Sequence, residues 1–276
     1  MEKIGWFPGH MQKAKKEMIE KLKLVNIVYL VVDARLPKSS FNPMIMEIAQ
    51  SKPILLLLSK AGLADIKQTE KWMNYYKNEG YYVLDVDAIN GYNMKKIIPI
   101  TKEILKPVLE KNKSRGVYLP MRAMITGIPN VGKSTIINHL ANKKIANVAD
   151  KPGVTKTQQW VRLDKDIDLL DTPGVLWPKL EENGLSLALS GAIKDDILPL
   201  EQIVIYGFNF MTEFYKDLLY KRYALNEPKS IEEYYEQIAK NRGCKMDDYE
   251  RVNRLFLHDL RHEKIGRVTF DQFTKI

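Results

Sequence analysis

The stretch that decides the fold is GIPNVGKS, residues 127–134. It matches the phosphate-loop pattern, in which two glycines enclose four residues and a lysine and a serine follow. An apolar stretch at residues 123–126 precedes it, and residues 134–141 have helical periodicity. Glycines let backbone N–H groups turn toward phosphate oxygens, and the positive end of the following helix faces the same anion. The motif therefore predicts a nucleotide site rather than a chance glycine turn with a surface lysine.

The residues of this loop have separate predicted roles. Lys133 is expected to neutralise the β- and γ-phosphates and so to act as a catalytic residue, and the Ser134 hydroxyl is expected to bind Mg²⁺. The other residues expected to line the phosphates are Asn130, Val131, Gly132 and Thr135.

A second motif, DTPG at residues 171–174, follows a predicted strand. Asp171 is placed to hold the ligand shell of Mg²⁺, and the Gly174 N–H to face the γ-phosphate. Between the two motifs lies KPGVT, whose Thr155 can place its hydroxyl on Mg²⁺ only when the third phosphate is present. In this order after a phosphate loop, the segments predict a nucleotide-dependent switch.

Short apolar stretches alternate with helical periodicity through the first 175 residues. The predicted strands are residues 25–32, 53–58, 81–86, 123–126 and 168–170. The predicted helices among them are residues 41–50, 68–78, 93–110 and 134–141. This alternation predicts an α/β fold with a doubly wound, mostly parallel sheet.

Helical patterns dominate after residue 178, and a linker is expected earlier in the chain. Residues 110–116 are polar, basic and without periodicity, which predicts a linker there. The later helical candidates are residues 185–194, 208–223, 231–240 and 249–260. We therefore predict a nucleotide-binding domain over residues 1–178 and a smaller, all-helical domain over residues 179–276.

Composition narrows the class of protein. The chain has 276 residues, 45% hydrophobic and 28% charged, which excludes a disordered or collagen-like chain. Its single cysteine, Cys244, cannot form an intramolecular disulfide, as is typical of a reducing compartment. The apolar stretches are too short to cross a bilayer, and the first residues do not resemble a secretory signal. We expect a cytoplasmic protein without a membrane partner, and nothing in the sequence requires an oligomer.

The net charge of +9 is unevenly distributed along the chain. Residues 1–179 carry 29 Lys and Arg against 17 Asp and Glu, a balance of +12, whereas residues 180–276 carry 14 against 17. A basic surface of this kind favours a polyanionic partner such as RNA. A solvated lysine-rich surface without a partner is the alternative.

The phosphate loop followed by DTPG resembles the translation-factor-like GTPases, but no base-recognition motif follows residue 175. Two loops upstream occupy the equivalent places, each directly after a predicted strand. Their residues are Ser59, Lys60, Ala61 and Gly62 in the first loop and Asp87 and Ala88 in the second. Because a site in a doubly wound sheet is built from loops at the carboxyl ends of its strands, chain order can be rearranged without moving the site.

That rearranged order resembles the YlqF/RbgA family of circularly permuted GTPases, which act in assembly of the large ribosomal subunit. WFPGHM at residues 6–11, DARLP at residues 33–37, the base loop, the phosphate loop and DTPG occur in the order of that family. The resemblance covers essentially the whole chain, and GRVTFD at residues 266–271 resembles part of the family's RNA-binding domain.

The resemblance implies hydrolysis of GTP to GDP and phosphate, stimulated by the ribosome. It also implies binding to the large subunit and its rRNA, with action late in subunit assembly. Two other functions remain open from the residues alone. One is a nucleotide-binding RNA chaperone with relaxed base selectivity and little turnover. The other is a phosphate-loop ATPase or kinase, which the DTPG motif and the permuted order disfavour.

The base loop departs from the family pattern, which has an Asn and an Asp where this chain has Ser59 and Gly62. The missing carboxylate accepts hydrogen bonds from the guanine ring N–H and amino group, and Gly62 supplies no acceptor. Loss of such a buried pair removes roughly a hundredfold or more of discrimination. We therefore expect weaker guanine selectivity than in the family.

Hydrolysis requires a group that orients the attacking water, and Val175 stands where ordinary small GTPases have a glutamine. The resemblance implies that His10 takes this catalytic role, and a surface or capping histidine is the alternative. In several related GTPases an asparagine at the position of Asn130 binds K⁺, so K⁺ is expected as a further cofactor.

Overall fold

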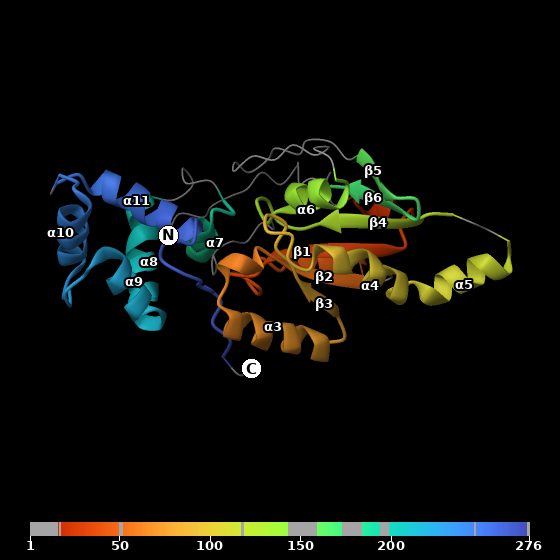
Figure 1. Cartoon of the computed structure of the whole chain (residues 1–276), viewed down its shortest axis with the longest axis horizontal. Helices are drawn as coiled ribbons and strands as arrows, with labels where there is room; N and C mark the ends of the chain where they lie inside the picture. Colours follow the sequence, from red (N-terminus) through yellow and green to blue (C-terminus); the bar gives the residue numbers. More distant parts are fainter. Residues whose placement is uncertain are drawn as a thin grey trace.

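The structure is a computed structural model that describes residues 16, 18–49, 52–116, 119–142, 159–172, 184–193, 199–245 and 247–274. A six-stranded sheet flanked by helices occupies one end of the molecule, and a group of helices from the C-terminal region occupies the other (Figure 1).

The sheet confirms the predicted doubly wound, mostly parallel fold. Its strands are β1 (Ile27–Asp33), β2 (Ile54–Ser59), β3 (Tyr82–Asp85), β4 (Met121–Thr126), β5 (Gln159–Asp164) and β6 (Ile167–Asp171). Their order across the sheet is β3-β2-β1-β4-β6-β5, and all neighbouring pairs are parallel except β5 with β6. The antiparallel edge strand β5 was not predicted, because its polar residues and half-exposed Trp160 lack the apolar pattern of the central strands.

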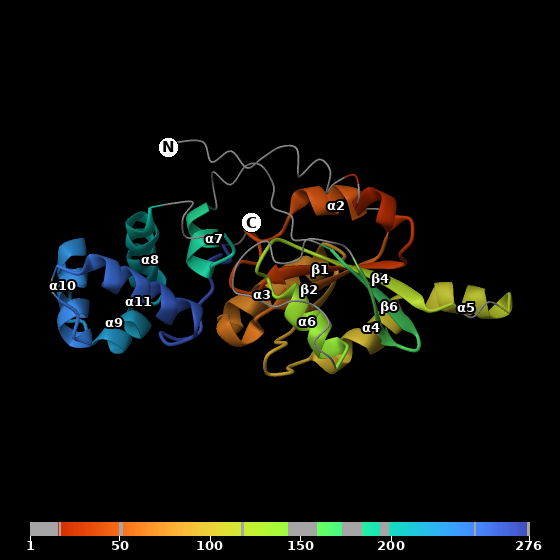
Figure 2. The ribbon, with the colours of Figure 1, turned by 90° about the horizontal axis from the view of Figure 1, so that it is seen from above.

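Helices cover both faces of the sheet, so the central strands are buried on both sides. Alternate residues of β1 belong to two separate cores. One core includes α4 (Ile97–Ile104) and α6 (Lys133–Leu140), and the other includes α2 (Pro43–Ala49), α3 (Ile66–Asn78) and the helical residues 18–22. Figure 2 shows α2 and α6 on opposite sides of the sheet.

The predicted linker at residues 110–116 is wrong for most of its length. Residues 110–114 continue α5 (Lys106–Ser114), and only Arg115 and Gly116 lie beyond the helix within the described part of this stretch. The helix has a proline in its first turn and no breaker before Gly116. It contains no buried residue and extends past the end of the sheet (Figure 1). An exposed helix lacks the apolar periodicity by which helices are recognised in a sequence.

The C-terminal region is helical, as predicted, but its boundaries differ. The helices are α7 (Gly184–Ser190), α8 (Leu200–Phe214), α9 (Lys216–Tyr223), α10 (Ile231–Arg242) and α11 (Tyr249–Arg261). The predicted helix at residues 208–223 is two helices, because the backbone of Tyr215 leaves the helical conformation at φ −141° and ψ 37°. Helix α7 lies between the sheet and the other C-terminal helices (Figure 1). Within the described ranges, no helix is both long and apolar enough to cross a bilayer.

The last described residues return from the helices to the sheet. The Val268 N–H donates to the Leu63 carbonyl at 3.0 Å, and the Phe270 N–H donates to the Arg35 carbonyl at 2.7 Å. The Asp271 carboxylate accepts hydrogen bonds from loop residues that follow β1. The part of the chain that resembles an RNA-binding domain therefore ends on the nucleotide-binding side, and the domain boundary at residue 178 stays a prediction.

Candidate nucleotide site

The predicted phosphate and base loops lie along one edge of the sheet, at the carboxyl ends of the parallel strands. The chain runs outward from β1 through β2 to β3, and then outward in the opposite direction from β4 to β6. Ligands of such sheets bind at the point where the strand order reverses, here between β1 and β4. The loop after β4 is the phosphate loop, and the loops after β2 and β3 are the predicted base loops.

The phosphate loop passes close to the neighbouring strand. A Cβ on Gly127 would lie 2.3 Å from the Val31 carbonyl oxygen of β1, and the residue has φ +154°, so only glycine fits there. Ile128 and Val131 are fully buried and anchor the loop in the core, and Gly132 directly precedes α6. The predicted loop conformation therefore follows from packing against β1.

The Lys133 amine is folded over its own loop. It donates to the carbonyl oxygens of Gly127 at 3.1 Å and Ile128 at 2.7 Å. Burial lowers the pKa of Lys133 to about 8; the nearby Asp171 charge opposes this shift and the Lys60 charge adds to it. The structure thus brings the lysine of the phosphate loop, the lysine of the base loop and the acidic residue of DTPG to one place.

Asp171 is a buried carboxylate at the end of β6. It is 1% exposed, and neither carboxylate oxygen has a hydrogen-bond partner of good geometry among the described residues. Burial raises its pKa to about 6, although the Lys133 charge acts in the opposite direction. A buried ionised group without donors is costly unless a cation or bound water satisfies it. Asp171, with the Ser134 hydroxyl at the start of α6, is therefore a donor set that fits hydrated Mg²⁺.

Ser59 connects the first base loop to the phosphate loop. Its hydroxyl lies 2.5 Å from the Val131 carbonyl oxygen and 2.9 Å from that of Val32, so one hydrogen is shared between two acceptors. The next residues connect the base loop to the second one, because the Ala61 N–H donates to the Val86 carbonyl at 3.1 Å. The serine that replaces the family asparagine therefore holds the two loops together.

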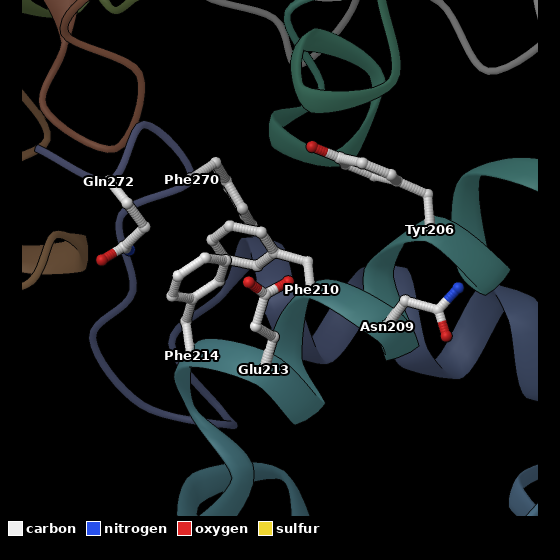
Figure 3. Close-up of a pocket in the computed structure, with 7 residues that line it drawn as sticks. All are labelled: Tyr206, Asn209, Phe210, Glu213, Phe214, Phe270 and Gln272. Atoms are coloured by element: carbon white, nitrogen blue, oxygen red, sulfur yellow. The ribbon is translucent and has the colours of Figure 1, made fainter. Parts of the chain in front are cut away.

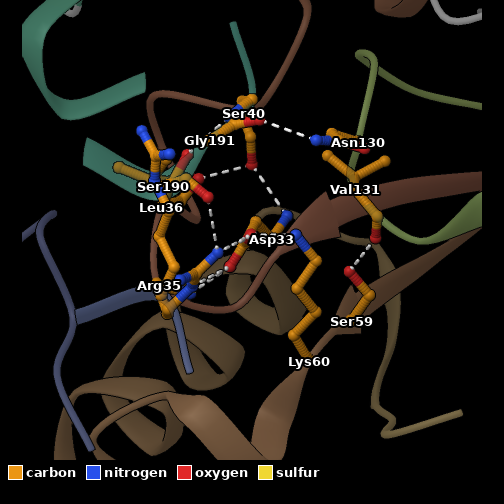
Figure 4. Close-up of polar contacts among 12 residues, drawn as sticks. Asp33, Arg35, Leu36, Ser40, Ser59, Lys60, Asn130, Val131, Ser190 and Gly191 are labelled. Carbon is orange, nitrogen blue, oxygen red and sulfur yellow. Dashed lines mark hydrogen bonds and ion pairs between the residues drawn. The ribbon is translucent and has the colours of Figure 1, made fainter. Parts of the chain in front are cut away.

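The Lys60 side chain ends on a buried ion pair that was not predicted as part of the site. Its amine lies 2.9 Å from Asp33, whose two carboxylate oxygens also accept from the Arg35 guanidinium at 3.0 and 2.8 Å (Figure 4). Burial alone raises the pKa of Asp33, but the Arg35 and Lys60 charges outweigh it and hold that pKa well below its ordinary value. The signal in the sequence is an oppositely charged pair directly after a wholly apolar stretch.

The same group of residues contacts α7 of the helical region. Arg35 donates to the Ser190 carbonyl at 3.1 Å, and the Asn130 side-chain amide donates to the Gly191 carbonyl at 2.8 Å (Figure 4). Arg261 of α11 donates to two further carbonyls of α7. Three of these four acceptors belong to the last turn of α7, where carbonyls have no N–H partner four residues ahead in the helix. The phosphate loop, the end of β1 and α11 thus meet at one helix end.

The remaining predicted residues divide into those in the described ranges and those outside them. Thr135 lies partly buried in the first turn of α6, and the Ala88 carbonyl lies 3.0 Å from Nδ1 of His139. Gly62 packs against Asp87. His10, Thr155 and Gly174 lie outside the described residues.

A cavity of about 300 Å³ lies elsewhere, between α8 and the C-terminal segment (Figure 3). It is lined by Tyr206, Asn209, Phe210, Glu213, Phe214, Phe270 and Gln272. None of these belongs to the predicted nucleotide site, so the cavity does not mark it.

Comparison with known proteins identifies the family. The model of the family described as 50S ribosome-binding GTPase matches residues 122–221. Ribosome biogenesis GTPase A of Priestia megaterium is 49% identical over 97% of this chain and 96% of its own length. The protein of the same name from Bacillus licheniformis is 47% identical over 98% of both chains.

A solved structure agrees with these relatives. The crystal structure of GNP-bound YlqF from T. maritima has a TM-score of 0.63 and 27% identity, and the match covers 94% of this chain and 98% of that one. These similarities favour a GTPase over the nucleotide-binding RNA chaperone considered above. The chain belongs to the ribosome biogenesis GTPase A family, and it is a circularly permuted GTPase of ribosome assembly.

Proposed function

We propose that this GTPase is a nucleotide-dependent switch that binds the large ribosomal subunit and its rRNA and acts late in the assembly of that subunit. The observation that supports the switch is the pair of contacts from Asn130 and Arg35 to the end of α7. Through them, a rearrangement of the phosphate loop acts directly on the helical region. The positive balance of residues 1–179 and the names of the relatives favour rRNA as the partner.

The nucleotide is held by the loops at the carboxyl ends of the parallel strands. In this proposal the Lys133 amine leaves its loop carbonyls for the β- and γ-phosphates, and the Gly174 N–H donates to the γ-phosphate. Ser134, Asp171 and Thr155 hold Mg²⁺, which supplies positive charge beside the phosphates. The Asp171 carboxylate supports this assignment, because the hydrated cation provides the donors that it does not find among the described residues.

The attacking water is oriented by His10, since Val175 has no hydrogen-bonding group. A partner that positions the N-terminal segment would then control the rate, which is the expected basis of stimulation by the ribosome.

Potassium is the proposed second cation, beside Asn130. Replacing K⁺ with Na⁺ in the assay buffer is expected to slow GTP hydrolysis about tenfold, because positive charge beside the phosphates stabilises the transition state. Phosphate release at constant ionic strength measures the effect. The Asn130→Ala variant should show the same rate in both salts, and equal wild-type rates in K⁺ and Na⁺ would count against the proposal.

Ribosome binding is tested by phosphate release with and without large subunits, and by sedimentation with those subunits. We expect faster release with large subunits than with small ones, and co-sedimentation that differs between GDP and a non-hydrolysable GTP analogue. Exposed α5 carries Lys111 and Lys113 at its end. Replacing both with glutamine should weaken binding about tenfold at low salt and reduce its salt dependence. Equal co-sedimentation with large subunits in GDP and in the GTP analogue would contradict the proposed switch.

A further inference from the structure

We propose that Asp87 is the residue that recognises guanine in this GTPase, supplying from the second base loop the carboxylate that the first loop lacks at Gly62. The inference rests on GTP being the substrate, and it concerns how the site selects that nucleotide.

The first observation is the space beside Gly62. A Cβ built on Gly62 would lie 2.3 Å from Oδ2 of Asp87 and 3.5 Å from the side-chain nitrogen of Asn90. The backbone of Gly62 lies outside the left-handed region, so conformation does not require glycine there. The Asp87 carboxylate itself excludes a side chain from this position.

The distance between the Cβ position of Gly62 and Oδ2 of Asp87 also shows how the Asp87 carboxylate is placed. In an aspartate, the carboxylate oxygens lie at a distance from their own Cβ comparable to the 2.3 Å that separates Oδ2 of Asp87 from the Cβ position of Gly62. Asp87 therefore places an oxygen within the reach of an aspartate at position 62. An aspartate at position 62 and the observed Asp87 are mutually exclusive, since each carboxylate would fill the space of the other.

The second observation is that the two loops are fixed relative to each other. The residues adjacent to Gly62 and Asp87 are hydrogen-bonded, from the Ala61 N–H to the Val86 carbonyl at 3.1 Å. The preceding strands, β2 and β3, are neighbours in the sheet. The juxtaposition of Gly62 with Asp87 is therefore set by the sheet and not by a chance loop contact.

The Asp87 carboxylate is held in place by its own loop. Its Oδ1 accepts from the backbone N–H groups of Ile89 at 2.9 Å and Asn90 at 3.3 Å, and Oδ2 accepts from the Asn90 side chain at 3.0 Å. On the other side of the loop, His139 of α6 contacts the Ala88 carbonyl. Because such acceptors are already fixed, they lose little conformational entropy when they bind a ligand in one orientation.

The chemistry of the carboxylate suits guanine and rejects adenine. Guanine presents two donors on one edge, its ring N1–H and its amino group, whereas adenine presents an acceptor at N1. An ionised carboxylate has about four acceptor positions, and Asp87 uses three of them, leaving capacity on Oδ2. When guanine binds, the base replaces the exposed Asn90 amide as the donor to Oδ2. Because Asp87 is only 5% exposed, an unmatched base would leave it poorly solvated, which is how such sites gain selectivity.

The test replaces Asp87 by asparagine and compares the affinities for GTP and XTP. Xanthine keeps the ring N1–H but has a carbonyl in place of the amino group, so an amide, which has one acceptor and one donor, complements it. We expect Asp87→Asn to shift the ratio of the two dissociation constants toward XTP by about a hundredfold. An unchanged ratio would overturn the inference.

Two further variants make the result independent of folding. Asp65 lies three residues after Gly62 in the chain, and it caps α3 by accepting from the N–H groups of Lys67 and Gln68. Since asparagine also caps helices, Asp65→Asn should fold normally and keep the wild-type ratio; a shift as large as that of Asp87→Asn would overturn the inference. Should Asp87→Asn bind neither nucleotide, the double variant Gly62→Asp/Asp87→Ala decides, because alanine at position 87 frees the space that a side chain at position 62 needs: recovered preference for GTP supports the inference, and no recovery refutes it.

The outcome is separable from that of the proposed function. Stimulation of wild-type GTP hydrolysis by large subunits is measured without any variant. If stimulation is present and the Asp87→Asn ratio does not move, base recognition alone is misassigned. Wild-type affinity for ATP within tenfold of that for GTP would likewise refute recognition by Asp87 while leaving hydrolysis intact.

Discussion

The Asp171→Asn variant is expected to lose GTP hydrolysis by at least about a hundredfold and yet to resist unfolding better than the wild type without ligands. The activity falls because an amide carries no charge to hold Mg²⁺ beside the phosphates. The stability rises because Asp171 is buried, has no donor of good geometry in the part of the chain that the structure describes, and has a pKa raised to about 6. Removing this ionised group should increase the free energy of unfolding by about 1–3 kcal/mol at neutral pH.

The pH dependence of that gain gives a second measurement. The pKa of Asp171 is higher in the folded chain than the ordinary value of 3.8, so the folded state binds its proton more tightly than the unfolded state. The penalty is absent below about pH 4, develops between pH 4 and 6, and is complete above. In urea unfolding without ligands, the free energy of unfolding of Asp171→Asn should therefore exceed that of the wild type by an amount that shrinks from pH 7.5 to pH 5.

A neighbour on the same strand provides the matched control. Asp168 of β6 pairs with the largely exposed Arg162, so Asp168→Asn should change neither hydrolysis nor stability beyond about 1 kcal/mol. Full activity in Asp171→Asn would remove Asp171 from the magnesium site.

The Asp33→Asn variant is expected to lose about 3–5 kcal/mol of unfolding free energy, because it leaves the Arg35 guanidinium buried without its counter-charge. Both residues are 1% exposed, and one nitrogen of Arg35 already lacks a hydrogen-bond partner among the described residues. The variant also removes the carboxylate that holds Lys60. Urea unfolding at neutral pH, where the wild-type carboxylate is ionised, measures the loss.

The control for this variant is the same substitution in a surface ion pair. Asp166 lies 2.6 Å from Lys102, and both side chains are about two-fifths exposed, so Asp166→Asn should cost at most about 1 kcal/mol. Equal losses in the two variants would show that burial of the Asp33–Arg35 pair has no special energetic weight.

The parts of the fold that were predicted are those with a strong local pattern. β1 and β2 are continuous apolar stretches because both faces of the sheet are covered, and such stretches are recognisable without a structure. β5 and the second half of α5 were missed for the opposite reason. One is an edge strand and the other an exposed helix, so packing imposes no periodic pattern on either.

The site shows the same division. The phosphate loop was predicted because its glycines and lysine are adjacent in the chain and serve one chemical purpose. The contacts of Arg35 with Ser190 and of Asn130 with Gly191 were not, because they join residues 155 and 61 positions apart through backbone carbonyls. A backbone carbonyl is present in every residue, so the sequence carries no mark of which one accepts.

The sequence by itself predicted a site for a nucleoside triphosphate on a parallel sheet, because the residues of the phosphate loop are adjacent in the chain. It also placed the base loops after β2 and β3. Only the tertiary structure decided which carboxylate stands beside the base loop. Gly62 alone predicts a missing acceptor, whereas the pairing of β2 with β3 brings the Asp87 carboxylate into the space that the glycine leaves. Local chemistry is written in neighbouring residues, but complementarity between two loops depends on the sheet that holds them together.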